Sequence, residues 1–203
     1  MMKSLELINK PDHLVGLVGD AACGKDLIAG IFEGYGYVHQ SASDIVREEI
    51  RSRGLEPTRE LQTSVANEVR KEKGEAYFVF SAIKRATESE QYDGRVVISG
   101  LYAPAEGEYF KLFDSTLISV SGLDSDSLSA RYERVVARNS GSRDKLSYEE
   151  FVAAYQRENG GIDSNEANVG KLALMCDVRI VHGGTREELL PLVGAVVKEY
   201  ANG

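Results

Sequence analysis

Several features that would place a protein in a specialised class are scarce in this chain of 203 residues. Its two cysteines, Cys23 and Cys176, belong to no CxxC pair or Cys/His cluster, so we expect no disulfide framework and a reduced compartment. No apolar run approaches the roughly 18 residues that span a bilayer. The polar stretch 1–11 lacks the apolar core of a signal peptide. We therefore expect a cytoplasmic protein with no membrane partner.

Positive charge is also scarce, since 24 lysines and arginines stand against 32 acidic residues and give a formal net charge of −8. A negative chain is a poor general binder of the nucleic-acid backbone, so we expect no nucleic-acid partner. The length suits one α/β domain over residues 1–203. The sequence leaves open whether the chain is a monomer or a homodimer.

Five short apolar segments alternate with stretches of helical spacing. This alternation predicts an α/β fold with a parallel sheet, right-handed crossovers and helices on both faces. We expect residues 158–165 to be flexible. The strands are expected at 14–18, 37–39, 95–98, 115–120 and 178–181. The helices are expected at 25–32, 41–53, 75–89, 105–112, 127–138, 147–157 and 166–175, with two more that begin near 57 and 185.

A glycine-rich motif, GDAACGKD at 19–26, follows the first expected strand and matches GxxxxGK. Glycines let the backbone bring several N–H groups around phosphate oxygens. The helix that begins near Gly24 adds the positive end of its dipole, and Lys25 supplies a cation for the β- and γ-phosphates. We predict a nucleoside triphosphate site, against the alternative of a plain glycine-rich turn. Its residues are Gly19, Ala21, Ala22, Cys23, Gly24, Lys25, Asp26 and Leu27.

The last position of this motif departs from the usual pattern. Asp26 stands where a Ser or Thr hydroxyl normally ligates Mg²⁺. A carboxylate can hold this ion directly or through water, because Mg²⁺ favours oxygen ligands. We therefore expect ATP and Mg²⁺ as cofactors, with Asp26 in the metal shell. The three histidines, His13, His39 and His182, have no metal-ligand spacing and are expected at strand ends and in loops.

Four segments resemble, in chain order, the nucleoside-monophosphate-kinase-like branch of P-loop proteins, with dephospho-CoA kinase and related archaeal nucleotide kinases closest. The segments are GLVGDAACGKD at 16–26, SASDIVREEIRSRGLEPT at 41–58, RYERVVARN with Arg143 and Asp144 at 131–144, and CDVRIVHGGTREEL at 176–189. The resemblance implies a three-layer P-loop NTPase fold whose five-stranded sheet has the order 2-3-1-4-5. It also implies acceptor-binding helices at about 41–90 and a helical lid at about 131–160.

The resemblance implies roles for particular side chains. Asp44 faces the phosphoryl acceptor, as a hydroxyl-orienting base or an acceptor contact, and Arg47 binds the acceptor's phosphate. Their spacing of three also puts this acid and this anion clamp on one helix face. Lid arginines close over the transferring phosphoryl group. They are Arg131, Arg134, Arg138 and Arg143. The loop expected to contact adenine is Gly183, Gly184 and Thr185, although Thr185 is also explained as a helix cap.

Ser99 and Tyr102 depart from the related kinases, which carry an acid and an arginine at these positions. In those kinases the acid helps to hold Mg²⁺ through water, and the arginine helps to bind the acceptor phosphate. We still expect Ser99 and Tyr102 at the substrate site, with changed chemistry. If Asp26 replaces the missing acid, Asp26 and Ser99 should face the same space.

These features predict an ATP-dependent phosphotransferase whose partner is a nucleotide or nucleotide-like small molecule. Nucleoside monophosphates, deoxynucleotides and dephospho-CoA all remain open as acceptors. The changes at Ser99 and Tyr102 motivate an alternative, a catalytically weakened nucleotide-binding module that regulates a partner by conformation. A plain NTPase ranks below both, because no hydrophobic strand ends in Asp-Glu.

Overall fold

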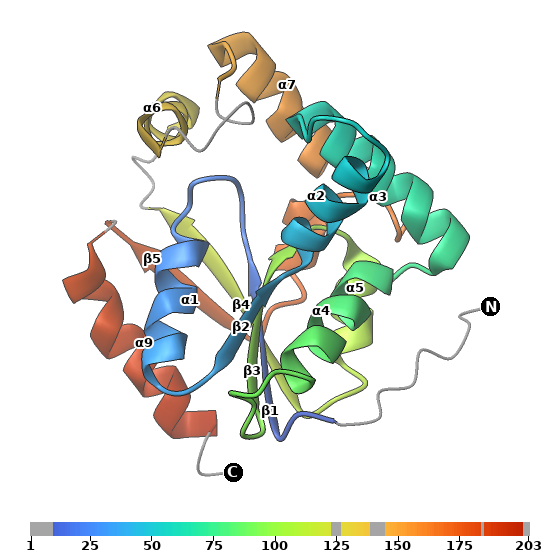
Figure 1. Cartoon of the computed structure of the whole chain (residues 1–203). Coiled ribbons are helices and arrows are strands. Elements are labelled where there is room, and N and C mark those ends of the chain that lie inside the picture. Colours follow the sequence, from blue (N-terminus) through green and yellow to red (C-terminus); the bar gives the residue numbers. More distant parts are fainter. Residues whose placement is uncertain (1–9, 123–126, 139–144, 184, 201–203) are drawn as a thin grey trace.

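The computed structural model describes residues 10–122, 127–138, 145–183 and 185–200. Its centre is a five-stranded sheet in the order β2-β3-β1-β4-β5, and every neighbouring pair is parallel. Helices cover both faces of this sheet (Figure 1). The predicted fold class and strand order are confirmed. The strands are β1 His13–Val18, β2 Val38–Ser41, β3 Arg95–Leu101, β4 Ser115–Gly122 and β5 Val178–His182.

The central strands form where the sequence has unbroken apolar runs. In β3, for example, Val96, Val97 and Ile98 are all fully buried. Such runs are typical of parallel strands that are covered by helices on both faces, because both sides of the strand need apolar side chains. The loops that leave β1 and β3 consequently emerge side by side at the carboxyl edge of the sheet, where open α/β sheets bind ligands.

Two hydrophobic clusters, one on each side of the sheet, fix the helical layers. On one face α1 Lys25–Gly34 and α9 Arg186–Tyr200 pack together. The other layer contains α2 Ala42–Ser52, α3 Arg59–Lys73, α4 Tyr77–Thr87, α5 Pro104–Phe110 and α8 Val169–Ala173. The remaining helices, α6 Leu128–Arg138 and α7 Tyr148–Asn159, lie beyond the carboxyl edge of the sheet (Figure 1). None of the helices in the described ranges combines the length and the hydrophobicity that a membrane span needs.

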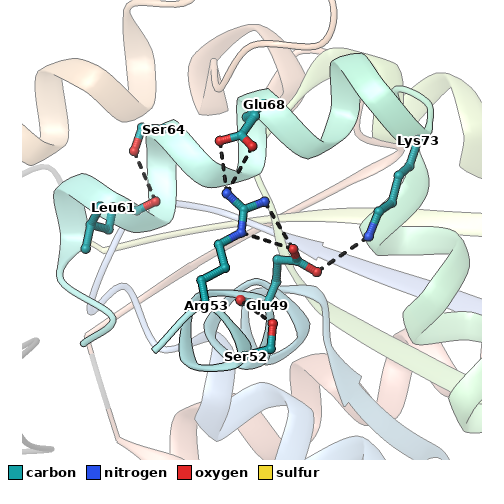
Figure 2. Close-up of polar contacts among 7 residues, drawn as sticks. All are labelled: Glu49, Ser52, Arg53, Leu61, Ser64, Glu68 and Lys73. Atoms are coloured by element: carbon teal, nitrogen blue, oxygen red, sulfur yellow. Dashed lines mark hydrogen bonds and ion pairs between the residues drawn. The ribbon is translucent and has the colours of Figure 1, made fainter. Parts of the chain in front are cut away.

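Charged side chains join α2 to α3 on their outer side. Figure 2 shows Arg53, the C-cap of α2, between Glu49 of α2 and Glu68 of α3, with N–O distances of 3.0 Å to both carboxylates. Lys73 at the end of α3 also contacts Glu49 at 3.5 Å. Exposed ion pairs contribute little individually, but a connected set restricts how the two helices slide past one another. The pairing of α2 with α3 builds one wall of the site described below.

The predicted boundaries of the helices and loops are wrong mainly near the end of α7. The helix continues to Asn159, so residues 158 and 159 are not part of a flexible stretch, and Glu158 is only 7% exposed. The chain after α7 is held by hydrogen bonds, such as Asn168 Nδ2 to the Gly161 carbonyl at 2.8 Å. Asn168 also caps α8 by accepting from Lys171 N, so that helix begins at Val169 and not at 166. Polar residues suggested a loop here, but their tertiary partners order the segment.

Candidate functional site

The glycine-rich loop joins β1 to α1 at the carboxyl edge of the sheet. Gly24 is the N-cap of α1 and has a φ of +97°, a conformation that favours glycine. A side chain at this position would also collide with His182, whose Nε2 would lie 2.6 Å from the added Cβ. The backbone of the loop thus stays open at the helix N-terminus, where N–H groups and the helix dipole favour an anion.

Lys25 folds back over this loop. Its Nζ donates to the carbonyl oxygens of Gly19 and Asp20, both at 2.6 Å, and the residue is 9% exposed. Burial lowers the pKa of the Lys25 ammonium, but surrounding acidic groups outweigh this effect and raise the pKa above its ordinary value. These groups, in order of effect, are Cys23, Tyr102, Asp26 and Glu158. The lysine is therefore a fixed positive charge at the mouth of the loop.

His182 at the end of β5 supports the loop from the other side. Its Nε2 lies 2.8 Å from the carbonyl oxygen of Cys23, and the ring is buried. The strand-end position of His182 was expected, but its contact with the loop was missed. The two residues are 159 positions apart, and only the parallel pairing of β5 with β4 brings them together.

A cavity of about 550 Å³ opens beside the loop, between it and the helices α2 and α3. Five cationic side chains and three carboxylates line this cavity, so its wall has an excess of positive charge in a chain whose net charge is −8. The size suits a small molecule, and the charge favours an anionic one. The cations are Lys25, Arg47, Arg59, Arg70 and Arg134. The carboxylates are Asp26, Asp44 and Glu158.

The predicted nucleotide-binding residues divide into three groups. Ala21, Ala22, Gly24, Lys25 and Asp26 line the cavity. The Cys23 side chain is buried beneath the loop, with its Sγ 3.5 Å from Lys25 Nζ, and Leu27 packs against the hydrophobic cluster of α1 and α9. Gly19 accepts the hydrogen bond from Lys25. The side chain of Cys23 therefore supports the loop from beneath, and that of Leu27 anchors α1 to its hydrophobic cluster.

Asp44 and Arg47 both line the cavity and form an ion pair one helical turn apart on α2. This pair confirms that they share a helix face. The Asp44 side chain is 56% exposed, and the Arg47 side chain is 15% exposed and also donates to Gln62 of α3 at 3.4 Å. An exposed carboxylate that is held in an ion pair is better suited to bind the phosphoryl acceptor than to take a proton from it.

Asp26 and Ser99 line the same cavity, as the expected replacement of the missing acid requires. Ser99 is 2% exposed, and its Oγ makes a 2.9 Å hydrogen bond with His39 Nε2. Burial lowers the pKa of His39, against the opposing effect of nearby carboxylates. Tyr102 also lines the cavity, and burial, followed by the charge of Glu158, raises the pKa of its hydroxyl.

Arg70 was missed by the sequence analysis. Its guanidinium is 3% exposed and lines the cavity, and its Nη2 and Nε donate to Glu106 Oε1 at 2.7 and 3.1 Å. The other oxygen of Glu106 accepts from the backbone N–H groups of Tyr102 and Ala103, at 2.7 and 3.0 Å. One fully buried carboxylate thus ties α3 to the loop after β3.

Residues of α6 and α7 contact the phosphate loop directly. Arg131 donates to Asp20 Oδ2 at 2.7 Å, and Asn159 donates to Asp20 Oδ1 at 3.2 Å. Arg134 Nε donates to the Ala22 carbonyl at 3.2 Å and lines the cavity. Of the other two lid arginines, Arg143 lies outside the described residues, and so does the side chain of Arg138.

The loop expected to contact adenine lies after β5. Thr185 caps α9, since its Oγ1 accepts from Glu188 N at 3.3 Å, and the Glu188 carboxylate accepts from Gly183 N at 3.1 Å. Gly184 lies outside the described residues. Gly183 and Thr185 are not among the described residues that line the cavity, so the adenine contact stays a prediction.

No protein-family model matches the chain. A UPF0200 protein of Thermococcus sibiricus is 34% identical over 146 residues, which cover 71% of this chain and 76% of that protein. A UPF0200 protein of Pyrobaculum aerophilum is 30% identical over 146 residues, with coverage of 72% and 77%. A third, from Methanocaldococcus jannaschii, is 26% identical over 189 residues, with coverage of 93% and 91%.

Two solved structures share the fold. TT1252 from Thermus thermophilus has a TM-score of 0.55 at 16% identity, with 94% of this chain and 98% of that chain covered. Shikimate kinase from Acinetobacter baumannii, in complex with shikimate, has a TM-score of 0.52 at 12% identity, with coverage of 96% and 94%. These similarities support a kinase-like fold. The closer resemblance to dephospho-CoA kinase stays a prediction.

Proposed function

This chain belongs to the UPF0200 family, and from its site we propose that it is an ATP-dependent phosphotransferase for an anionic nucleotide or nucleotide-like small molecule. One observation carries this proposal: the phosphate loop forms part of the wall of the cation-lined cavity, and Lys25 belongs to both. A triphosphate in the loop would therefore face an acceptor in the cavity. Catalysis of phosphoryl transfer is mainly positioning and charge neutralisation, which this arrangement supplies.

In the proposed enzyme the backbone of the loop and Lys25 hold the triphosphate. Asp44 and Arg47 contact the acceptor, Ser99 and Tyr102 form its wall, and Arg134 neutralises charge from the lid side. By resemblance, Arg138 and Arg143 would add to that charge, and Gly183, Gly184 and Thr185 would contact adenine. We also propose a cytoplasmic location, no nucleic-acid or membrane partner, and a monomer or homodimer.

Asp26 is the side chain that would hold Mg²⁺ beside the phosphates. Its carboxylate lines the cavity next to Lys25, and magnesium prefers such oxygen ligands while keeping several waters. Among the described residues, no group of three or more His, Cys, Asp or Glu side chains could hold a metal ion by itself. The ion would therefore depend on Asp26 together with the phosphate oxygens, and it would neutralise charge on the triphosphate.

A direct experiment tests the proposal. Purified protein is given ATP and Mg²⁺ with each member of a panel of nucleoside monophosphates, deoxynucleotides and dephospho-CoA, and ADP is measured. Acceptor-stimulated ADP formation and an ATP-dependent rise in melting temperature are expected. A protein that binds ATP tightly without such stimulation would support the alternative, a nucleotide-binding regulatory module. That alternative is motivated by Ser99, which is bonded to His39 where related kinases have an acid.

The metal role of Asp26 makes a separate prediction. We expect Asp26→Ala, which removes the oxygen ligand, to raise the Mg²⁺ concentration needed for half-maximal ATP affinity by about tenfold, the equivalent of about 1.4 kcal/mol. Titration of ATP binding against Mg²⁺ by calorimetry measures the change. Glu33→Ala, which alters an exposed acid on the same helix, should leave the requirement unchanged. An identical requirement in Asp26→Ala and the native chain would remove Asp26 from the metal shell.

A further inference from the structure

Glu158 is the one buried carboxylate among the described residues that line the large cavity. The residue is 7% exposed, whereas Asp26 and Asp44 are exposed. Its only close charged partner in the described part of the chain is Arg59, whose Nη1 lies 3.8 Å from Glu158 Oε1. That distance is well beyond the 2.7–2.9 Å typical of a charge-assisted hydrogen bond. The oxygens of Glu158 are not among the fully buried side-chain atoms that lack a partner. They line the cavity, so they can accept a hydrogen bond from a molecule bound there.

The position of Glu158 within the cavity indicates which group donates this hydrogen bond. The next residue, Asn159, donates to Asp20 of the phosphate loop at 3.2 Å. Glu158 also lies beside Asp20 and Ala21 of that loop, in a crevice too narrow for a water molecule. Its carboxylate therefore stands at the loop end of the large cavity, where a phosphoryl group would be transferred.

The groups around Glu158 also shift its pKa in the direction that favours a base. Burial raises the pKa of its carboxyl group, and the charges of Arg59 and Lys25 oppose that rise. A general base is most effective when its pKa lies near the working pH. An upward shift moves the pKa of a glutamate towards neutral pH. The titratable and charged groups around it are Lys25 of α1, Asp20 of the loop, Arg59 of α3, Tyr102 after β3 and Arg157 of its own helix.

We propose that Glu158 is a catalytic carboxylate that takes the proton from a hydroxyl group of the acceptor, so that the acceptor is an alcohol that also carries an anionic group. This inference rests on the proposed phosphotransferase function. The hydroxyl proton moves to Glu158, and the acceptor oxygen forms a new bond to the γ-phosphorus of ATP. The bond from that phosphorus to the β,γ-bridging oxygen breaks, and ADP leaves with the electron pair. Glu158 then releases the proton to solvent.

The same carboxylate disfavours a monophosphate as the attacking group. The phosphate oxygen of a nucleoside monophosphate is already ionised, so it needs no base, and a carboxylate beside it would repel it. The hydroxyl group of an alcohol, in contrast, can donate a hydrogen bond to the Glu158 carboxylate. Its anionic group can meanwhile bind the arginines at the other positions of the cavity, Arg47 and Arg70. Glu158 therefore selects the attacking group, and the arginines select the rest of the acceptor.

Glu158→Gln tests this inference, with Glu149→Gln, an exposed acid on the same helix, as the control. The probe acceptors are dephospho-CoA and shikimate as anionic alcohols, AMP and dTMP as monophosphates, and water, whose use is measured as basal ATP hydrolysis. For Glu158→Gln we expect unchanged ATP affinity, a fall in kcat of about 100-fold or more with the alcohols and with water, and little change in KM. The acidic limb of the pH–rate profile should disappear, and Glu149→Gln should behave as the native chain.

The outcomes separate this inference from the proposed function. Equal turnover in Glu158→Gln and the native chain, or transfer to AMP or dTMP that Glu158→Gln leaves intact, would overturn the role of Glu158. A native protein that binds no ATP would overturn the phosphotransferase function itself. If Glu158→Gln does not fold, Glu158→Asp is the second variant. Aspartate keeps the charge, but its shorter side chain moves the carboxylate away from the acceptor hydroxyl. Glu158→Asp should fold and lose at least tenfold in kcat, and full activity in Glu158→Asp would contradict the inference.

Discussion

Replacing Lys25 by methionine is expected to lower ATP-dependent turnover by about 10²–10³-fold, the loss typical of removing one preorganised donor to developing charge. The Lys25 ammonium is held by two carbonyl oxygens of the loop at 2.6 Å, and its pKa is raised. It therefore stays charged and fixed over the neutral pH range. Methionine keeps most of the volume of the side chain but removes the charge. Steady-state ADP formation measures the loss, and calorimetry measures ATP affinity.

The control for this variant is Lys111→Met, since Lys111 lies on the surface and its ammonium pairs, within the described part of the chain, with the exposed Glu108 alone, at 3.4 Å. It should keep native turnover. Because Lys25 also donates hydrogen bonds to two carbonyl groups of the loop, melting temperatures of both variants should be recorded. A folded Lys25→Met protein with native turnover would show that this loop is not a catalytic phosphate site.

Replacing Glu106 by leucine is expected to lower the free energy of unfolding by about 3–5 kcal/mol, the cost of breaking a buried ion pair from one side. Glu106 is fully buried and accepts four hydrogen bonds, two from Arg70 and two from the backbone of Tyr102 and Ala103. Leucine fills the space but leaves the Arg70 charge without its carboxylate. Urea denaturation followed by circular dichroism measures the change.

Two further variants identify the cause of that loss. Glu108→Leu removes an acid two residues away that is largely exposed and whose ion-pair partner is the exposed Lys111, so it should change stability by less than about 1 kcal/mol. The double variant Arg70→Met with Glu106→Leu removes both charges and should be more stable than Glu106→Leu alone. Equal stability of the single and double variants would show that the lost backbone contacts, and not the unpaired charge, cause the effect.

Local patterns were enough to predict the phosphate loop and the acid–arginine pair on α2. The loop depends on glycines next to a strand and a helix, and Asp44 and Arg47 are one helical turn apart, so neighbours along the chain define both features. Glu158 could not be found in this way. It lies in a polar stretch whose composition suggests a loop, and its burial depends on packing of α7 against α3.

The sequence by itself determined the fold class, the glycine-rich loop and the acid–arginine pair on α2, because hydrophobic period, glycine position and helical spacing act over a few residues. Only the tertiary structure decided which distant side chains share the cavity. Arg59 and Arg70 of α3 meet Glu158 of α7, which is far away in the chain. The side chains of these three residues are at most 11% exposed, so little water screens their charges.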